Sequence, residues 1–125
     1  MRHMLVFAIG VSFAVAAPAA DWATFAECGG ADHLHIYSYD PGSISTRRGK
    51  MLVKVNVDYS RDPHSHARSG RMQWSLDCAG KTYFEQSRTD YRANRSVVAS
   101  YRKPSATMTI IGDSVADKLA RKVCT

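Results

Sequence analysis

Hydrophobic and polar residues alternate along the middle of the chain. In residues 51–60, MLVKVNVDYS, every second side chain from Met51 to Tyr59 is apolar or aromatic, and residues 71–78, RMQWSLDC, repeat this spacing. A period of two is the pattern of a strand with one buried face. Both segments are therefore predicted to be strands, and Cys78 is predicted to point into the core.

Shorter segments continue this pattern on both sides of the two central strands. Further strands are predicted at residues 81–92, 96–102 and 106–111. The turns between them are short, which favours antiparallel hairpins. Residues 43–55 predict another hairpin, whose exposed turn carries Arg47, Arg48 and Lys50.

The spacing of apolar residues changes at the C-terminus. In residues 114–124, SVADKLARKVC, apolar side chains recur every four positions, and Ser114 with Asp117 three residues later forms a helix-starting capping pair. One amphipathic helix packed on a sheet is expected. The predicted fold is therefore α+β, a single small domain with an antiparallel β-sheet of about five to six strands and a C-terminal α-helix.

An aromatic and histidine stripe precedes the first hairpin. Every second residue of the segment 33–39, HLHIYSY, belongs to it: His33, His35, Tyr37 and Tyr39. We expect this stripe to face solvent, with Leu34 and Ile36 on the core side. Tyr37 and Tyr39 are then candidate contacts for a partner, because tyrosine is enriched at protein interfaces. An ordinary solvent-facing strand surface is the competing interpretation.

The first 20 residues have the composition of an export signal. They contain one arginine, an apolar run of about 12 residues and small residues that fit an Ala-x-Ala cleavage site. The run is shorter than the roughly 20 residues that span a bilayer. Residues 1–20 are therefore predicted to be a removed signal peptide, and residues 21–125 to be an exported domain with no integral membrane segment. A glutamate directly before Cys28 does not suit a lipidation motif, so the domain is expected in the periplasm, on the cell surface or secreted.

The charge distribution and the lack of catalytic motifs argue against two classes of function, nucleic-acid binding and catalysis. The whole chain carries a formal charge of +6. The basic residues are spread along the chain without a basic helix or run, and we therefore expect no nucleic-acid partner. No Gly-x-Ser-x-Gly motif or distinct carboxylate pair appears, so the protein is predicted not to be an enzyme and to need no cofactor.

The three cysteines allow one disulfide in an oxidising compartment. Periodicity favours Cys78 with Cys124, since both lie on apolar faces, and this bridge would tie the helix to the sheet. The main competitor is a bridge between Cys28 and Cys124. Cys28 lies beside a Gly-Gly turn and is expected to stay free or to form an intermolecular bridge.

Two His-x-His pairs raise the question of a metal site. His33 and His35 would share one face of a strand and are weak candidate ligands. His64 and His66 lie in a polar segment, DPHSHARSG, that we expect to be a mobile loop. The cysteines are 50 and 46 residues apart, unlike the close pairs of structural zinc sites. No metal site is therefore predicted.

Several short motifs together resemble the bacterial surface-adhesin protein E family. They are the string Tyr-Asp-Pro-x-Ser-Ile at residues 39–44, the Asp-Cys pair at residues 77–78, and the closing Ser-to-Cys helix at residues 114–124. The resemblance implies a small antiparallel sheet and a C-terminal helix tied down by a disulfide between Cys78 and Cys124. It also implies attachment to host extracellular-matrix or serum proteins.

The sequence therefore predicts an exported, non-enzymatic binding protein. An exposed sheet face or the basic hairpin would contact the protein partner, with five candidate residues: Tyr37, Tyr39, Arg47, Arg48 and Lys50. One alternative is a periplasmic inhibitor of an enzyme such as lysozyme, which suits a basic protein poorly because like charges repel. Another alternative is a metal-binding envelope protein.

Overall fold

One antiparallel sheet and one helix make up the fold. The structure, a computed structural model, describes residues 21–125, and the predicted signal peptide at residues 1–20 lies outside that part. The elements are β1 (Ala23–Cys28), β2 (Leu34–Tyr39), the 3₁₀ turn η1 (Pro41–Ser43), β3 (Ser45–Arg47), β4 (Lys50–Arg61), β5 (Ser69–Asp77), β6 (Thr82–Tyr91), β7 (Val97–Tyr101), β8 (Met108–Thr109) and α1 (Val115–Val123). The strand order is β1-β2-β4-β5-β6-β7, with β3 paired to β4 and β8 paired to β6.

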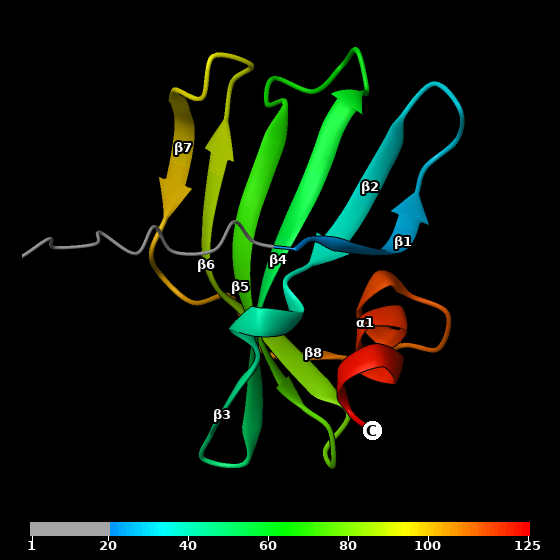
Figure 1. Cartoon of the computed structure of the whole chain (residues 1–125), viewed down its shortest axis with the longest axis vertical. Helices are drawn as coiled ribbons and strands as arrows, with labels where there is room; N and C mark the ends of the chain where they lie inside the picture. The colour runs from blue at the N-terminus through cyan, green and yellow to red at the C-terminus, as the bar shows by residue number, and fades with distance from the viewer. Residues whose placement is uncertain (1–20) are drawn as a thin grey trace, which may run out of the picture.

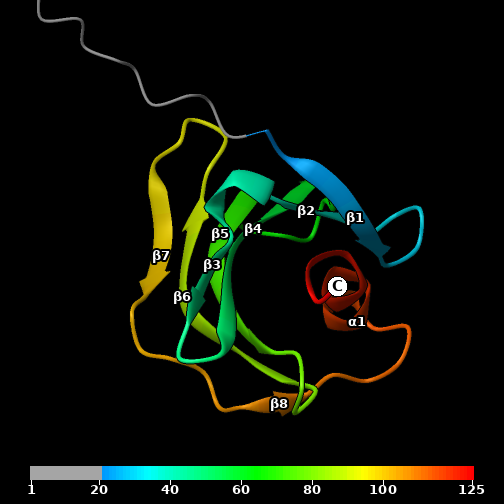
Figure 2. The ribbon, with the colours of Figure 1, turned by 60° about the horizontal axis from the view of Figure 1, so that its bottom comes forward.

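The sheet curls into a half-barrel, and α1 lies inside the curve (Figures 1 and 2). The helix packs against β1, so it covers one part of the concave face and leaves the part near β6 and β7 uncovered. Within residues 21–125, no helix has the length and apolar character that crossing a membrane requires.

The core lies between the central strands and α1. Val53, Val55 and Val57 of β4 are fully buried, and the first two lie opposite Trp74 and Met72 of β5. Residues directly opposite on antiparallel strands point to the same face, so these side chains form one apolar layer. The predicted inward faces of both strands are confirmed.

The predicted C-terminal helix and its disulfide are also confirmed. The Ser114 hydroxyl accepts a hydrogen bond from the Asp117 backbone N–H at 3.2 Å, which caps the first turn of α1. Leu119 is fully buried, and a disulfide joins Cys78 to Cys124, 46 residues apart. This bridge excludes the competing one to Cys28, which is exposed and unbridged.

The predicted number of strands is too low. Residues 21–125 contain eight strands, not five or six. The short strands β3, of three residues, and β8, of two, lie within the segments predicted at residues 43–55 and 106–111. The strand β1 was not predicted, since a bulge between Thr24 and Ala26 interrupts its alternation.

The predicted orientation of β2 is wrong. Tyr37 lies opposite Val57 and Tyr39 lies opposite Val55, so both tyrosines share the core-facing side. The ring of Phe25 from β1 contacts both, with centroids 6.1 and 5.8 Å away. Aromatic and aliphatic residues alternate along β2, so both of its faces are apolar and the period alone does not identify the buried one.

Candidate functional site

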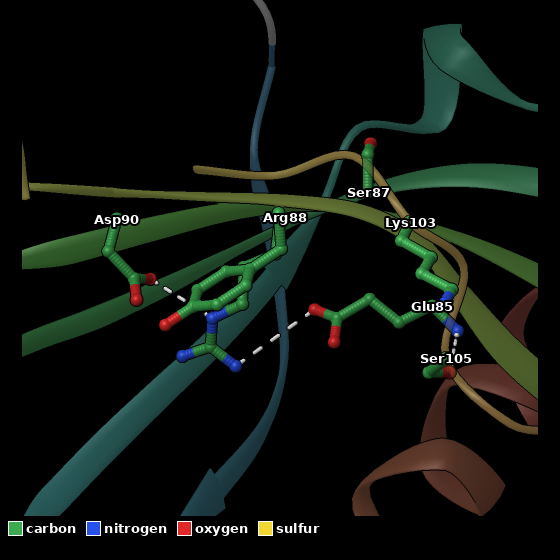
Figure 3. Close-up of a pocket in the computed structure, with 7 residues that line it drawn as sticks. Glu85, Ser87, Arg88, Asp90, Lys103 and Ser105 are labelled. Carbon is green, nitrogen blue, oxygen red and sulfur yellow. Dashed lines mark hydrogen bonds and ion pairs between the residues drawn. The ribbon is translucent and has the colours of Figure 1, made fainter. Parts of the chain in front are cut away.

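Charged and phenolic side chains gather on the uncovered part of the concave face (Figure 3). We name Tyr59, Glu85, Arg88 and Asp90 the Arg88 cluster. The Arg88 guanidinium donates a hydrogen bond from Nε to Asp90 Oδ1 at 3.1 Å and another from Nη2 to the Tyr59 hydroxyl. Its Nη1 lies 4.0 Å from Glu85 Oε1. The charge of Arg88 is therefore already matched by neighbouring carboxylates.

A bulge in β6 brings these charges to the concave face. Gln73 lies opposite Ser87 while the next residue, Trp74, lies opposite Glu85, so Gln86 is an extra residue in β6. After this insertion Arg88 and Asp90 point to the concave face, where strict alternation would place Ser87 and Thr89.

A glycine on the neighbouring strand makes room for the cluster. Asp90 lies opposite Gly70. A Cβ added at Gly70 would lie 2.7 Å from Asp90 Oδ1 and 3.4 Å from the Tyr59 ring. A larger residue would therefore displace the Asp90 carboxylate from Arg88.

Burial dominates the electrostatics of the cluster. Burial raises the pKa of Glu85, and the charge of Arg88 offsets only part of that rise. Within the described chain, Glu85 Oε1 is buried without a hydrogen-bond partner. Burial likewise raises the pKa of Tyr59, and it raises the pKa of the nearby Tyr37 to about 12.

Two cavities meet at the Arg88 cluster. The first, of about 410 Å³, is lined by Glu85, Ser87, Arg88, Asp90, Tyr101, Lys103 and Ser105. The second, of about 460 Å³, shares Arg88, Asp90 and Tyr101 and extends to Tyr37. Because the opposite charges around both cavities balance, the cluster offers no free charge to a ligand.

The loop after β4 folds back onto β2, contrary to the expected mobile loop. The Asp62 carboxylate contacts His33 Nδ1 at 3.3 Å through Oδ1 and His35 Nε2 at 2.7 Å through Oδ2. The ring of His64 lies 5.0 Å from that of His33. The hydrogen bond from His35, followed by that from the His64 backbone, lowers the pKa of Asp62 to about 2.

The contacts with Asp62 occupy the two histidines that were weak candidates for a metal site. His33 and His35 each direct one ring nitrogen at Asp62. Among residues 21–125, no group of three or more His, Cys, Asp or Glu side chains is placed to hold a metal ion.

The basic hairpin has the predicted exposed turn. Arg48 and Gly49 join β3 to β4 with φ angles of 52° and 77°. Positive φ at both positions is the requirement of a type I′ turn, which matches the twist of the flanking strands. Arg47, Arg48 and Lys50 are exposed, and none of the three forms an ion pair with a carboxylate of the described residues.

A third cavity, of about 290 Å³, lies beside this turn. Its lining residues are Arg47, Arg48, Lys50, Leu52, Ser75, Phe84, Gln86 and Pro104. The Lys50 ammonium lies 5.6 Å from the centroid of the Phe84 ring. Three of the five candidate contact residues thus meet here, while Tyr37 and Tyr39 lie on the concave face.

The sequence-based prediction missed the Arg88 cluster and Asp62. The spacing of Glu85, Arg88 and Asp90, three and then two residues, breaks the strand alternation and was a usable sign of the bulge. No comparable local sign marked Asp62, because its two partners are 29 and 27 residues away.

Comparison with known proteins agrees with this architecture. The structure resembles that of Haemophilus influenzae protein E with a TM-score of 0.56 at 19% identity, over 87% of this chain and 90% of that one. A second crystal form of that protein gives 0.56 at 17% identity, over 87% and 94% of the two chains. No curated protein matches the chain. The family model described as Surface-adhesin protein E matches residues 22–125. The chain therefore belongs to the surface-adhesin protein E family.

Proposed function

We propose that this protein is an exported, non-enzymatic adhesin that attaches to host extracellular-matrix or serum proteins through its basic hairpin. Membership of the surface-adhesin protein E family supports the adhesive role. The observation that carries the choice of surface is the exposed turn with Arg47, Arg48 and Lys50, whose charges have no carboxylate partner in the described chain.

Unpaired charges suit such a contact. Arg88 already directs its donors at Asp90, Tyr59 and Glu85, so its charge is compensated within the domain. Arg47 and Arg48 have no such partner in the described chain, and a guanidinium binds a carboxylate with two parallel hydrogen bonds. Exposed charges of this kind speed association and make it sensitive to salt.

The concave face is a secondary surface in this proposal. Tyr37 and Tyr39 remain candidate contacts, but a partner would reach them only from the hollow side of the sheet. Tyr37 lines the cavity of about 460 Å³ there. Phe25 packs on both rings, which leaves less of each available.

Binding of the exported protein to immobilised laminin and vitronectin tests the proposal. Binding should weaken as salt is raised. The variant Arg47→Gln/Arg48→Gln/Lys50→Gln should bind at least tenfold more weakly. Its matched control removes three exposed charges elsewhere: Lys54→Gln/Lys118→Gln/Lys122→Gln. Absence of binding at micromolar protein, or equal losses in both variants, would contradict the proposal.

Display on the cell surface is a separate requirement for adhesion. Protease added to intact cells should digest the protein, while a periplasmic marker stays protected. Protection of the protein under these conditions would place it inside the envelope and remove the adhesive role.

A further inference from the structure

The cavity beside the basic turn has an apolar floor, which the charges alone do not explain. Leu52, Ser75 and Phe84 lie opposite one another on β4, β5 and β6. Their neighbours Val53 and Trp74 belong to the core, so these three residues lie on the opposite, convex face. Leu52 and Phe84 are partly exposed there.

Two further features make this cavity a defined site. Pro104, from the segment between β7 and β8, lines it from the other side. Ser75 also lines it and is only 3% exposed, and it is the one buried polar residue of the described chain. The cavity therefore combines an apolar floor, a buried hydroxyl and a basic rim.

From these observations we propose that the cavity binds an acidic peptide segment of the protein partner, with a large apolar side chain seated on Leu52 and Phe84 and carboxylates paired with Arg47, Arg48 and Lys50. This inference deepens the proposed function and rests on it for the nature of the partner. The volume of about 290 Å³ suits one large side chain, not a folded surface.

The apolar floor decides between occupants that carry negative charge. A sulfated polysaccharide would pair with the basic rim but has no large apolar side chain to fill the cavity over Leu52 and Phe84. A second copy of this chain would bring a second set of basic residues to the same rim, and like charges repel. A peptide with one large apolar residue flanked by acidic residues satisfies both the rim and the floor.

Short peptides provide the test. The probe is the blocked peptide Asp-Asp-Phe-Asp-Asp, with two controls in which either the phenylalanine or all four aspartates are replaced by serine. Calorimetric titration of the full exported protein should give at least tenfold tighter binding of the probe than of either control. Amide NMR signals of Lys50, Ser75 and Phe84, which line the cavity, should shift with the probe. Equal binding of the control that lacks phenylalanine would overturn the inference.

Variants of the cavity and a competing polyanion test whether the apolar floor contributes to binding. Phe84→Ser should weaken probe binding at least fivefold, and Lys50→Gln provides a second variant at an exposed position that does not endanger folding. Thr89→Ser, on β6 beyond the cavity, is the control that should leave binding unchanged. Heparin fragments that bind more tightly than the probe, and do so equally to Phe84→Ser, would overturn the inference in favour of a polysaccharide.

The two proposals fail in different ways. If laminin and vitronectin bind in a hairpin-dependent manner but Phe84→Ser has no effect on them or on the peptide, the inference fails and the proposed function stands. If the peptide binds in a Phe84-dependent manner but no matrix or serum protein binds, the proposed function fails and the peptide site stands.

Discussion

Removal of the Cys78–Cys124 disulfide should cost much of the stability of the domain. The bridge spans 46 residues between the end of β5 and the end of α1. In the chain-entropy model, closing a loop of that length lowers the entropy of the unfolded state enough to stabilise the fold by about 4 kcal/mol. Small domains have a total stability of about 5–15 kcal/mol, so this single bond is a large fraction.

Urea unfolding measures this effect directly. The variant Cys78→Ala/Cys124→Ala should still fold, because Ala116, Leu119 and Val123 keep α1 in the core. With a slope of about 2 kcal/mol per molar urea, its midpoint should fall by about 2 M. The slope should rise slightly, since an unfolded chain without the bridge exposes more surface.

A control separates the bridge from the mere loss of a thiol. Cys28→Ser changes an exposed, unbridged cysteine and should alter the free energy of unfolding by less than about 0.5 kcal/mol. A loss below about 1 kcal/mol in the double variant would refute the loop-closure reasoning. The bridge would then act only as a local clamp on α1.

Three further substitutions test the site and the core by urea unfolding. Asp62 has a pKa lowered to about 2, so its contribution to stability is present above about pH 4 and lost as the pH falls toward 2, and Asp62→Asn should abolish that loss. Glu85 has a raised pKa, so its contribution to the free energy of unfolding is present at low pH and lost as the pH rises through that pKa. Glu85→Gln should therefore raise the urea midpoint more at pH 7 than at pH 4. A lower midpoint of this variant at pH 7 would show that the contact with Arg88 outweighs burial. Leu119→Ala, at a fully buried position, should cost about 2–5 kcal/mol, whereas the exposed Lys122→Ala should change little, and equal effects would contradict the packing of α1.

Features with a local pattern were predicted well. The alternation in β4 and β5 identified their buried faces, because a strand with one face in the core must place every second side chain there. The change to a period of four, with the cap at Ser114, identified α1. Cys78 and Cys124 both lie on apolar faces, and their pairing followed from that placement.

Features that depend on pairing between distant segments were not predicted. The inward face of β2 is decided by its register with β4, because aromatic and aliphatic residues alternate along β2 and either side could be buried. The Arg88 cluster depends on one extra residue, Gln86, that opposes nothing on β5. The contacts of Asp62 require a loop to return to β2 across 27 residues.

The sequence by itself determined the strands with one apolar face, the terminal helix, the disulfide and the exposed basic turn. Each of these depends on side chains a few positions apart, or on cysteines that lie on apolar faces. Only the tertiary structure decided which charges meet on the concave face and which apolar residues meet under the basic turn. Strand register and bulges set those neighbours, and a shift of one residue moves a side chain to the other face of the sheet.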